Sequence, residues 1–174
     1  MSIFQDISQF SNTSTYLPIL NGAILTDIIV IFMVIQGYIK SPALHEWYNE
    51  YGLSGVLADV LSITIGILLT RFFYPVFFGT FHMGLFLFLA VIIQCIHDLV
   101  FAQIFYGIPK GRSRILDTFK KYANESGALI LIADALMIIS ASIFASLFVS
   151  VGQNLNIVLF IVLLYLVPYF IYSL

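Results

Sequence analysis

The chain has 174 residues, 61% hydrophobic and 9% charged, and its mean hydropathy is +1.04. A soluble domain is about 45–50% apolar and about 25% charged, so a water-soluble enzyme and a disordered chain are both excluded. The single cysteine, Cys95, excludes a disulfide scaffold. The formal net charge of −2 provides no basic excess for binding phosphates, so we expect no nucleic-acid partner. We predict an all-α membrane protein.

Five stretches are long and apolar enough to cross a hydrocarbon core about 30 Å thick, which takes about 20 helical residues. They cover about residues 20–39, 53–73, 80–106, 127–149 and 155–174. Pro75 and Gly79 separate the second stretch from the third, and the longest polar connection is 107–126. We find no internal repeat and therefore predict one transmembrane helical bundle over residues 1–174.

Two connections carry apolar residues at helical spacing, which predicts short amphipathic helices at the membrane interface. In 43–51 the apolar face is aromatic and includes Trp47 and Tyr48, as expected where headgroups meet hydrocarbon. The basic connection contains a second amphipathic stretch at 113–123. We expect membrane lipids as partners, with anionic headgroups contacting Lys110, Arg112, Arg114, Lys120 and Lys121. An ordinary charge anchor explains these cations equally well.

The cations also predict the orientation, because short loops rich in Lys and Arg stay in the cytoplasm. Five of the seven lie between the third and fourth spans, and Lys40 lies between the first and second. With five spans these two connections are on the same side. We therefore expect a multi-pass protein with the N-terminus outside and the C-terminus inside.

Four acidic residues lie inside the spans, where charged groups are costly and often mark functional sites. Counting about 1.5 Å per residue from the span ends places Asp59, Asp98 and Asp134 at nearly one depth. His97 lies beside Asp98, and Gln94 lies one turn away on the same face. We predict an interior layer that binds ions or protons. Small residues share these faces, so we expect the second to fourth spans to surround the layer, with the first and fifth peripheral.

A second, thinner polar pair is expected toward the other end of the bundle. Asp27 lies about seven residues inside the first span, and Arg71 lies within one turn of the end of the second. A snorkelling Arg71 would reach Asp27 at this depth. We predict a structural ion pair, with a gate as the alternative.

Three acids and an imidazole in a low-dielectric interior need protons or a bound cation as compensation. An ion or proton channel or transporter is the first hypothesis, as a homo-oligomer because five spans rarely enclose a pore alone. A structural scaffold is the second hypothesis, with acids that only fix helix packing. The third is an intramembrane metal-binding protein, with His97, Asp98 and Asp134 as ligands, or a lipid-modifying enzyme with a bound lipid.

Three segments within roughly residues 56–148 carry a family resemblance. They are His97-Asp98-Leu-Val-Phe, the stretch from Ile108-Pro-Lys-Gly-Arg to Ser-Gly-Ala128, and Ala133-Asp-Ala-Leu-Met-Ile-Ile-Ser-Ala-Ser142. The chain resembles a group of uncharacterised small multi-pass membrane proteins of giant DNA viruses and marine environmental sequences. The resemblance implies a viral protein of the host cell membrane or the virion internal membrane. It carries over no catalytic residue, and whether the protein is an enzyme stays open.

Overall fold

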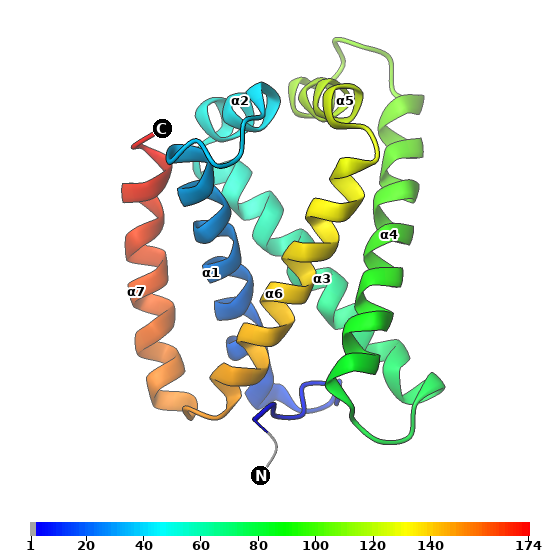
Figure 1. Ribbon diagram of the computed structural model, residues 1–174, viewed down its shortest axis with the longest axis vertical. Coiled ribbons are helices and arrows are strands. Elements are labelled where there is room, and N and C mark those ends of the chain that lie inside the picture. The colour runs from blue at the N-terminus through cyan, green and yellow to red at the C-terminus, as the bar shows by residue number, and fades with distance from the viewer. Residues whose placement is uncertain (1–2) are drawn as a thin grey trace.

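A computed structural model describes residues 3–174, which form seven α-helices after a 3₁₀ turn at Thr13–Thr15. The helices are α1 (Tyr16–Ile35), α2 (Pro42–Tyr51), α3 (Leu53–Phe77), α4 (Met83–Gly107), α5 (Arg114–Ser126), α6 (Leu129–Val149) and α7 (Gln153–Ile171). All but α2 and α5 are long and apolar enough to cross a membrane. Figure 1 shows these two short helices lying across one end of the bundle. The protein is a multi-pass helical membrane protein, which confirms the predicted fold class.

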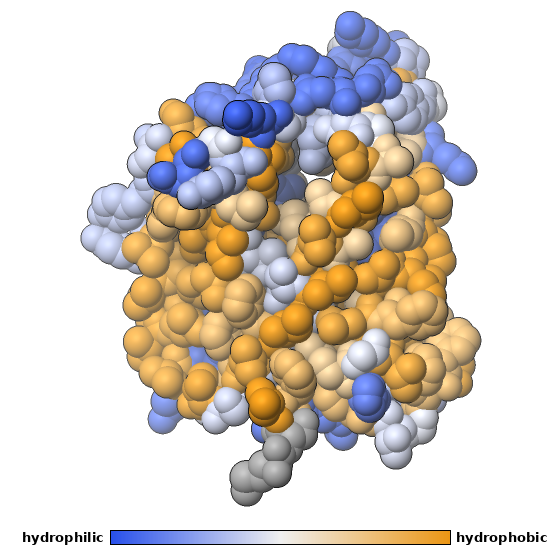
Figure 2. Space-filling model, in the orientation of Figure 1, coloured by the Kyte–Doolittle hydropathy of each residue, from blue (hydrophilic) through white to orange (hydrophobic). Residues whose placement is uncertain are grey.

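The outward surface of the long helices is apolar. Figure 2 shows a broad hydrophobic belt, with hydrophilic residues gathered at the end where α2 and α5 lie. Large apolar side chains in this belt are well exposed, such as Phe88 of α4 and Ile161 of α7. Helices satisfy their own backbone hydrogen bonds, so such a surface is suited to contact with lipid.

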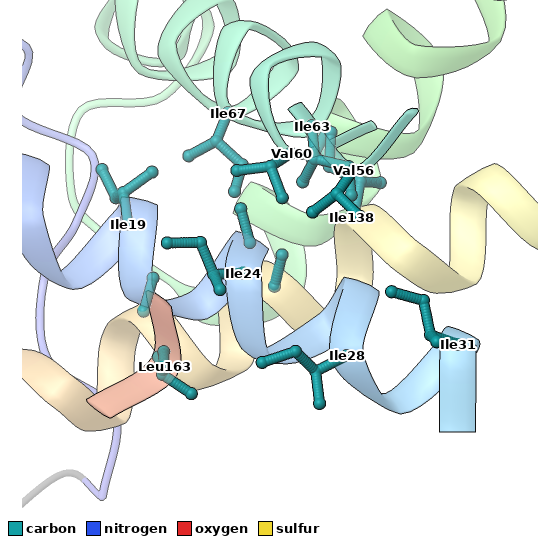
Figure 3. Packing of buried hydrophobic residues seen from close by; sticks show 14 of the residues in the cluster. Ile19, Ile24, Ile28, Ile31, Val56, Val60, Ile63, Ile67, Ile138 and Leu163 are labelled. Atoms are coloured by element: carbon teal, nitrogen blue, oxygen red, sulfur yellow. The ribbon is translucent and has the colours of Figure 1, made fainter. Parts of the chain in front are cut away.

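α1 is the central helix of the bundle. In its most apolar window 61% of the residues are buried, against 22–39% in the other four spanning helices. The core forms where α1 meets α3 and α6, and Figure 3 shows Ile24 of α1 with Val60 on one side of the helix and Leu163 on the other. The expectation of a peripheral first span was therefore wrong. Hydropathy measures how apolar a helix is, and it does not distinguish a face covered by protein from one covered by lipid.

Gly22 allows α1 to approach α6 at backbone distance. A Cβ atom at Gly22 would lie 2.5 Å from the carbonyl oxygen of Ala141 and 2.9 Å from the amide nitrogen of Ala145. Small residues at such crossings give transmembrane helices their closest packing. One residue earlier, the Asn21 side chain donates to the carbonyl oxygen of Asn156 over 2.9 Å, which ties α7 to α1.

α2 and α5 are built from the same local signals. A serine precedes each helix, and the hydroxyls of Ser41 and Ser113 accept a backbone N–H of the first turn. Each helix ends at a glycine with positive φ, +49° at Gly52 and +54° at Gly127. Only glycine adopts this conformation readily, and it turns the chain into the next membrane helix. Both predicted amphipathic helices are confirmed.

Candidate functional site

A cavity of about 930 Å³ lies among α1, α3, α4 and α6, with side chains of α2 and α5 at one end. Figure 2 shows the surface hollowed below these two short helices. Most of the cavity wall is aliphatic or aromatic. The polar lining residues are Thr26, Trp47, Tyr48, Asp59, Ser62, Gln94, His97, Asp98, Thr118, Tyr122, Asp134 and Ser140. Its volume falls within the range of small-molecule sites, about 300–1,000 Å³.

The residues of the predicted layer meet in this cavity. Asp59 comes from α3, Gln94, His97 and Asp98 come from α4, and Asp134 comes from α6. Counting the helical rise therefore identified side chains that share one interior space. No Lys or Arg side chain within residues 3–174 lines the cavity, so its ionisable groups are acids, tyrosines and one imidazole.

Asp98 is the centre of a hydrogen-bonded group on α4. The side-chain amide Nε2 of Gln94 donates to Asp98 Oδ1 over 2.8 Å, and His97 Nδ1 lies 3.1 Å from the same oxygen. The His97 ring stacks on Phe101, with ring centroids 6.0 Å apart. Asp98 Oδ2 and Gln94 Oε1 are buried and have no hydrogen-bond partner in the described part of the chain. Two acceptor atoms of this group thus lack a donor.

Two aromatic donors connect α2 to acids of the membrane helices. Trp47 Nε1 donates to Asp59 Oδ2 over 2.9 Å, and the Tyr48 hydroxyl donates to Asp27 Oδ1 over 2.8 Å. Burial raises the pKa of Tyr48 well above its ordinary value, and the nearby charges of Asp27 and Asp59 add to the effect. Tyr48 therefore keeps its proton and stays a donor at neutral pH.

Trp47 and Tyr48 were expected at the headgroups, and their contacts with the acids were not predicted. Both side chains are in fact buried, at 5% and 1% exposed. A signal was present, since two adjacent aromatic donors lie on a short helix between two acid-bearing spans. Buried tryptophan and tyrosine usually find a hydrogen-bond acceptor, and carboxyl groups nearby would have been the first to consider.

α2 and α5 also bind each other. Glu46 and Glu50 of α2 form ion pairs with Lys121 and Arg114 of α5. The Trp47 and Phe119 rings are 4.7 Å apart between their centroids. The two surface helices thus form one layer at the end of the bundle, with Trp47 and Phe119 facing the cavity.

Three of the five cations expected at lipid headgroups have partners within the protein. Lys121 and Arg114 pair with acids of α2, and Lys120 donates to the carbonyl oxygen of Ile108. Lys110 and Arg112 lie exposed in the loop between α4 and α5. Contact with anionic lipid stays a prediction, and these two side chains are the best placed to make it.

The predicted pair between Asp27 and Arg71 does not form, and this prediction was wrong. Asp27, in the middle of α1, accepts a hydrogen bond from the Tyr48 hydroxyl of α2. Arg71 is fully buried near the start of α1, where its Nη2 donates to the carbonyl oxygen of Asn12 over 3.0 Å and to the Thr15 hydroxyl over 2.8 Å. The segment before α1 supplies these acceptors, and estimating depth along the spans could not take that segment into account.

The metal-site hypothesis gains no support from the arrangement of the acids. Within residues 3–174, no group of three His, Cys, Asp or Glu side chains is arranged to hold a metal ion. His97, Asp98 and Asp134 line one cavity without forming such a group.

No protein family model, curated protein or solved structure matches the chain. The fold and the site define a multi-pass helical membrane protein with an acidic interior cavity beside two surface helices.

Proposed function

We propose that the protein binds protons or cations in the acidic cavity and moves them across the membrane. The observation that carries this proposal is that carboxyl groups from α3, α4 and α6, with one imidazole, line a single cavity that no described Lys or Arg enters. Acids gathered in a low dielectric favour a proton or a cation as counter-charge. Protonatable groups inside membrane helices are typical components of proton relays and ion pathways.

The position of the cavity favours access from the α2–α5 end. Packed apolar side chains such as Ile67 and Phe86, both fully buried, separate the acids from the opposite end of the bundle. A site reached from one side at a time is typical of a carrier. All the cations other than Arg71 lie at the α2–α5 end, which supports placing this end in the cytoplasm.

α2 is the element best suited to act as a gate. Its Trp47 and Tyr48 bind Asp59 and Asp27, and hydrogen bonds to a charged carboxylate are stronger than bonds to a neutral carboxyl group. Protonation of Asp59 therefore weakens the attachment of α2. Proton binding at Asp59 is in this way linked to the position of α2 beside the cavity.

The test is proton flux into liposomes that contain the purified protein and an internal pH-sensitive dye, driven by a potassium diffusion potential. We expect flux with the wild type and a decrease of about tenfold or more in Asp98→Asn and Asp134→Asn, since each removes a protonatable group. The matched control is Asp117→Asn, because Asp117 lies on α5 outside the cavity and binds the Gly111 amide. Absent flux, or equal flux in the cavity variants, would contradict the proposal.

A scaffold with purely structural acids is the second candidate. The bonds from Gln94 to Asp98 and from Trp47 to Asp59 favour it, because such contacts fix how helices pack. A scaffold predicts that Asp98→Asn lowers the unfolding temperature and that the wild type shows no flux. Stable, correctly assembled Asp98→Asn protein would count against this second role.

A further inference from the structure

We infer that the cavity binds an amphipathic organic cation, a molecule with one positive group and an apolar body. This inference deepens the proposed function and rests on it, because the same carboxyl groups hold the positive charge. It adds the class of molecule that the rest of the cavity accommodates.

The size and walls of the cavity suit an organic molecule better than an inorganic ion. A volume of about 930 Å³ is far larger than one ion needs, and the lining away from the acids is apolar, with Ile65, Met137 and Phe144 among its members. Pockets with such walls and a few placed polar groups are typical of small-molecule sites. An apolar body fills this space and packs against these side chains.

Two hydrogen-bond acceptors in the polar part of the cavity have no donor. Gln94 is only 4% exposed, and its Oε1 has no hydrogen-bond partner in the described residues. Asp98 Oδ2 also lacks a partner there. Gly66 makes room for this amide, because a Cβ there would lie 2.9 Å from Gln94 Oε1. Buried acceptors left unbonded are costly, and a positive charge in the neighbouring cavity offsets part of that cost by electrostatic attraction.

Aromatic rings stand close to the acids. Phe101 stacks on His97, and the centroids of Phe101 and Phe119 are 5.5 Å apart, with Trp47 next in the cluster. All of these line the cavity, and the faces of aromatic rings attract cations. An anionic amphiphile, such as a fatty acid or a lipid phosphate, meets three acids and a single imidazole there, with no Lys or Arg of the described residues, so the site discriminates against it.

The experiment compares two probes of nearly the same shape and opposite charge, tetraphenylphosphonium and tetraphenylborate. Equilibrium binding of each is measured to the full chain in nanodiscs of zwitterionic phosphatidylcholine, with empty nanodiscs subtracted. We expect saturable phosphonium binding, weakened about tenfold or more in Asp98→Asn and in Asp134→Asn, since an interaction with a charged group contributes about this factor. Asp117→Asn should bind like the wild type. Size-exclusion chromatography verifies that each variant is folded. If Asp98→Asn is not folded, Asp134→Asn alone is compared with the wild type.

Equal binding of tetraphenylborate, phosphonium uptake no greater than in empty nanodiscs, or unchanged affinity in both cavity variants would overturn the inference. The outcome is separable from that of the flux assay. Selective phosphonium binding without proton flux would remove the transport proposal and leave the ligand class standing. Proton flux without phosphonium binding would remove the ligand class alone.

Discussion

The Tyr48 hydroxyl of α2 donates a hydrogen bond to the buried Asp27 of α1. Tyr48→Phe keeps the ring and removes the hydroxyl, which leaves Asp27 Oδ1 without its donor. An unsatisfied buried acceptor costs about 1–3 kcal/mol, so we expect a lower unfolding temperature in detergent. Trp47 is the single tryptophan and lies beside Tyr48, so its fluorescence follows this region. The control is Tyr38→Phe, at a ring that is 75% exposed. Equal unfolding temperatures in the two variants would contradict a stabilising role of the hydrogen bond from Tyr48 to Asp27.

We expect Tyr122 to lower the stability of the folded protein at alkaline pH. Burial raises its pKa to about 12, and the charges of Asp134 and Asp59 add to this effect. An unfolded tyrosine ionises near pH 10. Above about pH 10 the unfolded state loses a proton that the folded state keeps, so the free energy of unfolding falls as the pH rises toward 12. Thermal unfolding at about pH 9 and pH 11 should show a smaller loss in Tyr122→Phe, and an equal loss would argue against the shift.

At the scale of the elements, α2 and α5 are joined by ion pairs that reversal of charge can test. Glu46→Lys opposes Lys121 and should loosen α2, which exposes Trp47 to acrylamide and increases quenching of its fluorescence. The double variant Glu46→Lys with Lys121→Glu restores the pair and should restore protection. The effect should decrease at high salt, because exposed charges are screened. Quenching that is the same in all three proteins would mean that the pair does not hold α2.

The contact between α1 and α6 depends on the missing side chain at Gly22. Gly22→Ala places a methyl group against backbone atoms of α6, and overpacking of this kind costs about 1–3 kcal/mol. We expect a lower unfolding temperature, measured by circular dichroism in detergent. Gly79→Ala is the matched control, because a Cβ there meets no heavy atom within 4 Å and its φ is not positive. A similar shift in both variants would show that α1 does not pack this closely.

The membrane helices could be predicted because a long apolar run in lipid must satisfy its backbone as a helix. Their ends could be predicted less well. The second span was expected to stop at residue 73, before Pro75, but α3 continues to Phe77 with Pro75 in its last turns. A proline there removes one hydrogen bond and does not prevent the chain from finishing the helix.

At the scale of the whole molecule, it could be predicted that the acids of α3, α4 and α6 share one interior space, because depth and helix face follow from counting residues. The partners of those acids depend on how separate elements come together. Trp47 turns inward because α2 packs onto the bundle, and Arg71 turns to the segment before α1. The central place of α1 had one sequence signal, Gly22 within an apolar span, which is typical of a close helix crossing.

Asp59 and Asp134 must face the same cavity if the acids are to act together. The direct measurement is cross-linking of an Asp59→Cys and Asp134→Cys pair, in a Cys95→Ser background, with a short bifunctional methanethiosulfonate, detected by intact mass. Ile132→Cys replaces Asp134→Cys in the control, because Ile132 lies two residues away at similar depth, is 58% exposed and does not line the cavity. We predict an intramolecular cross-link for the Asp59 and Asp134 positions and none for the control. No cross-link at the first pair, or equal cross-linking in both, would contradict the shared acidic cavity.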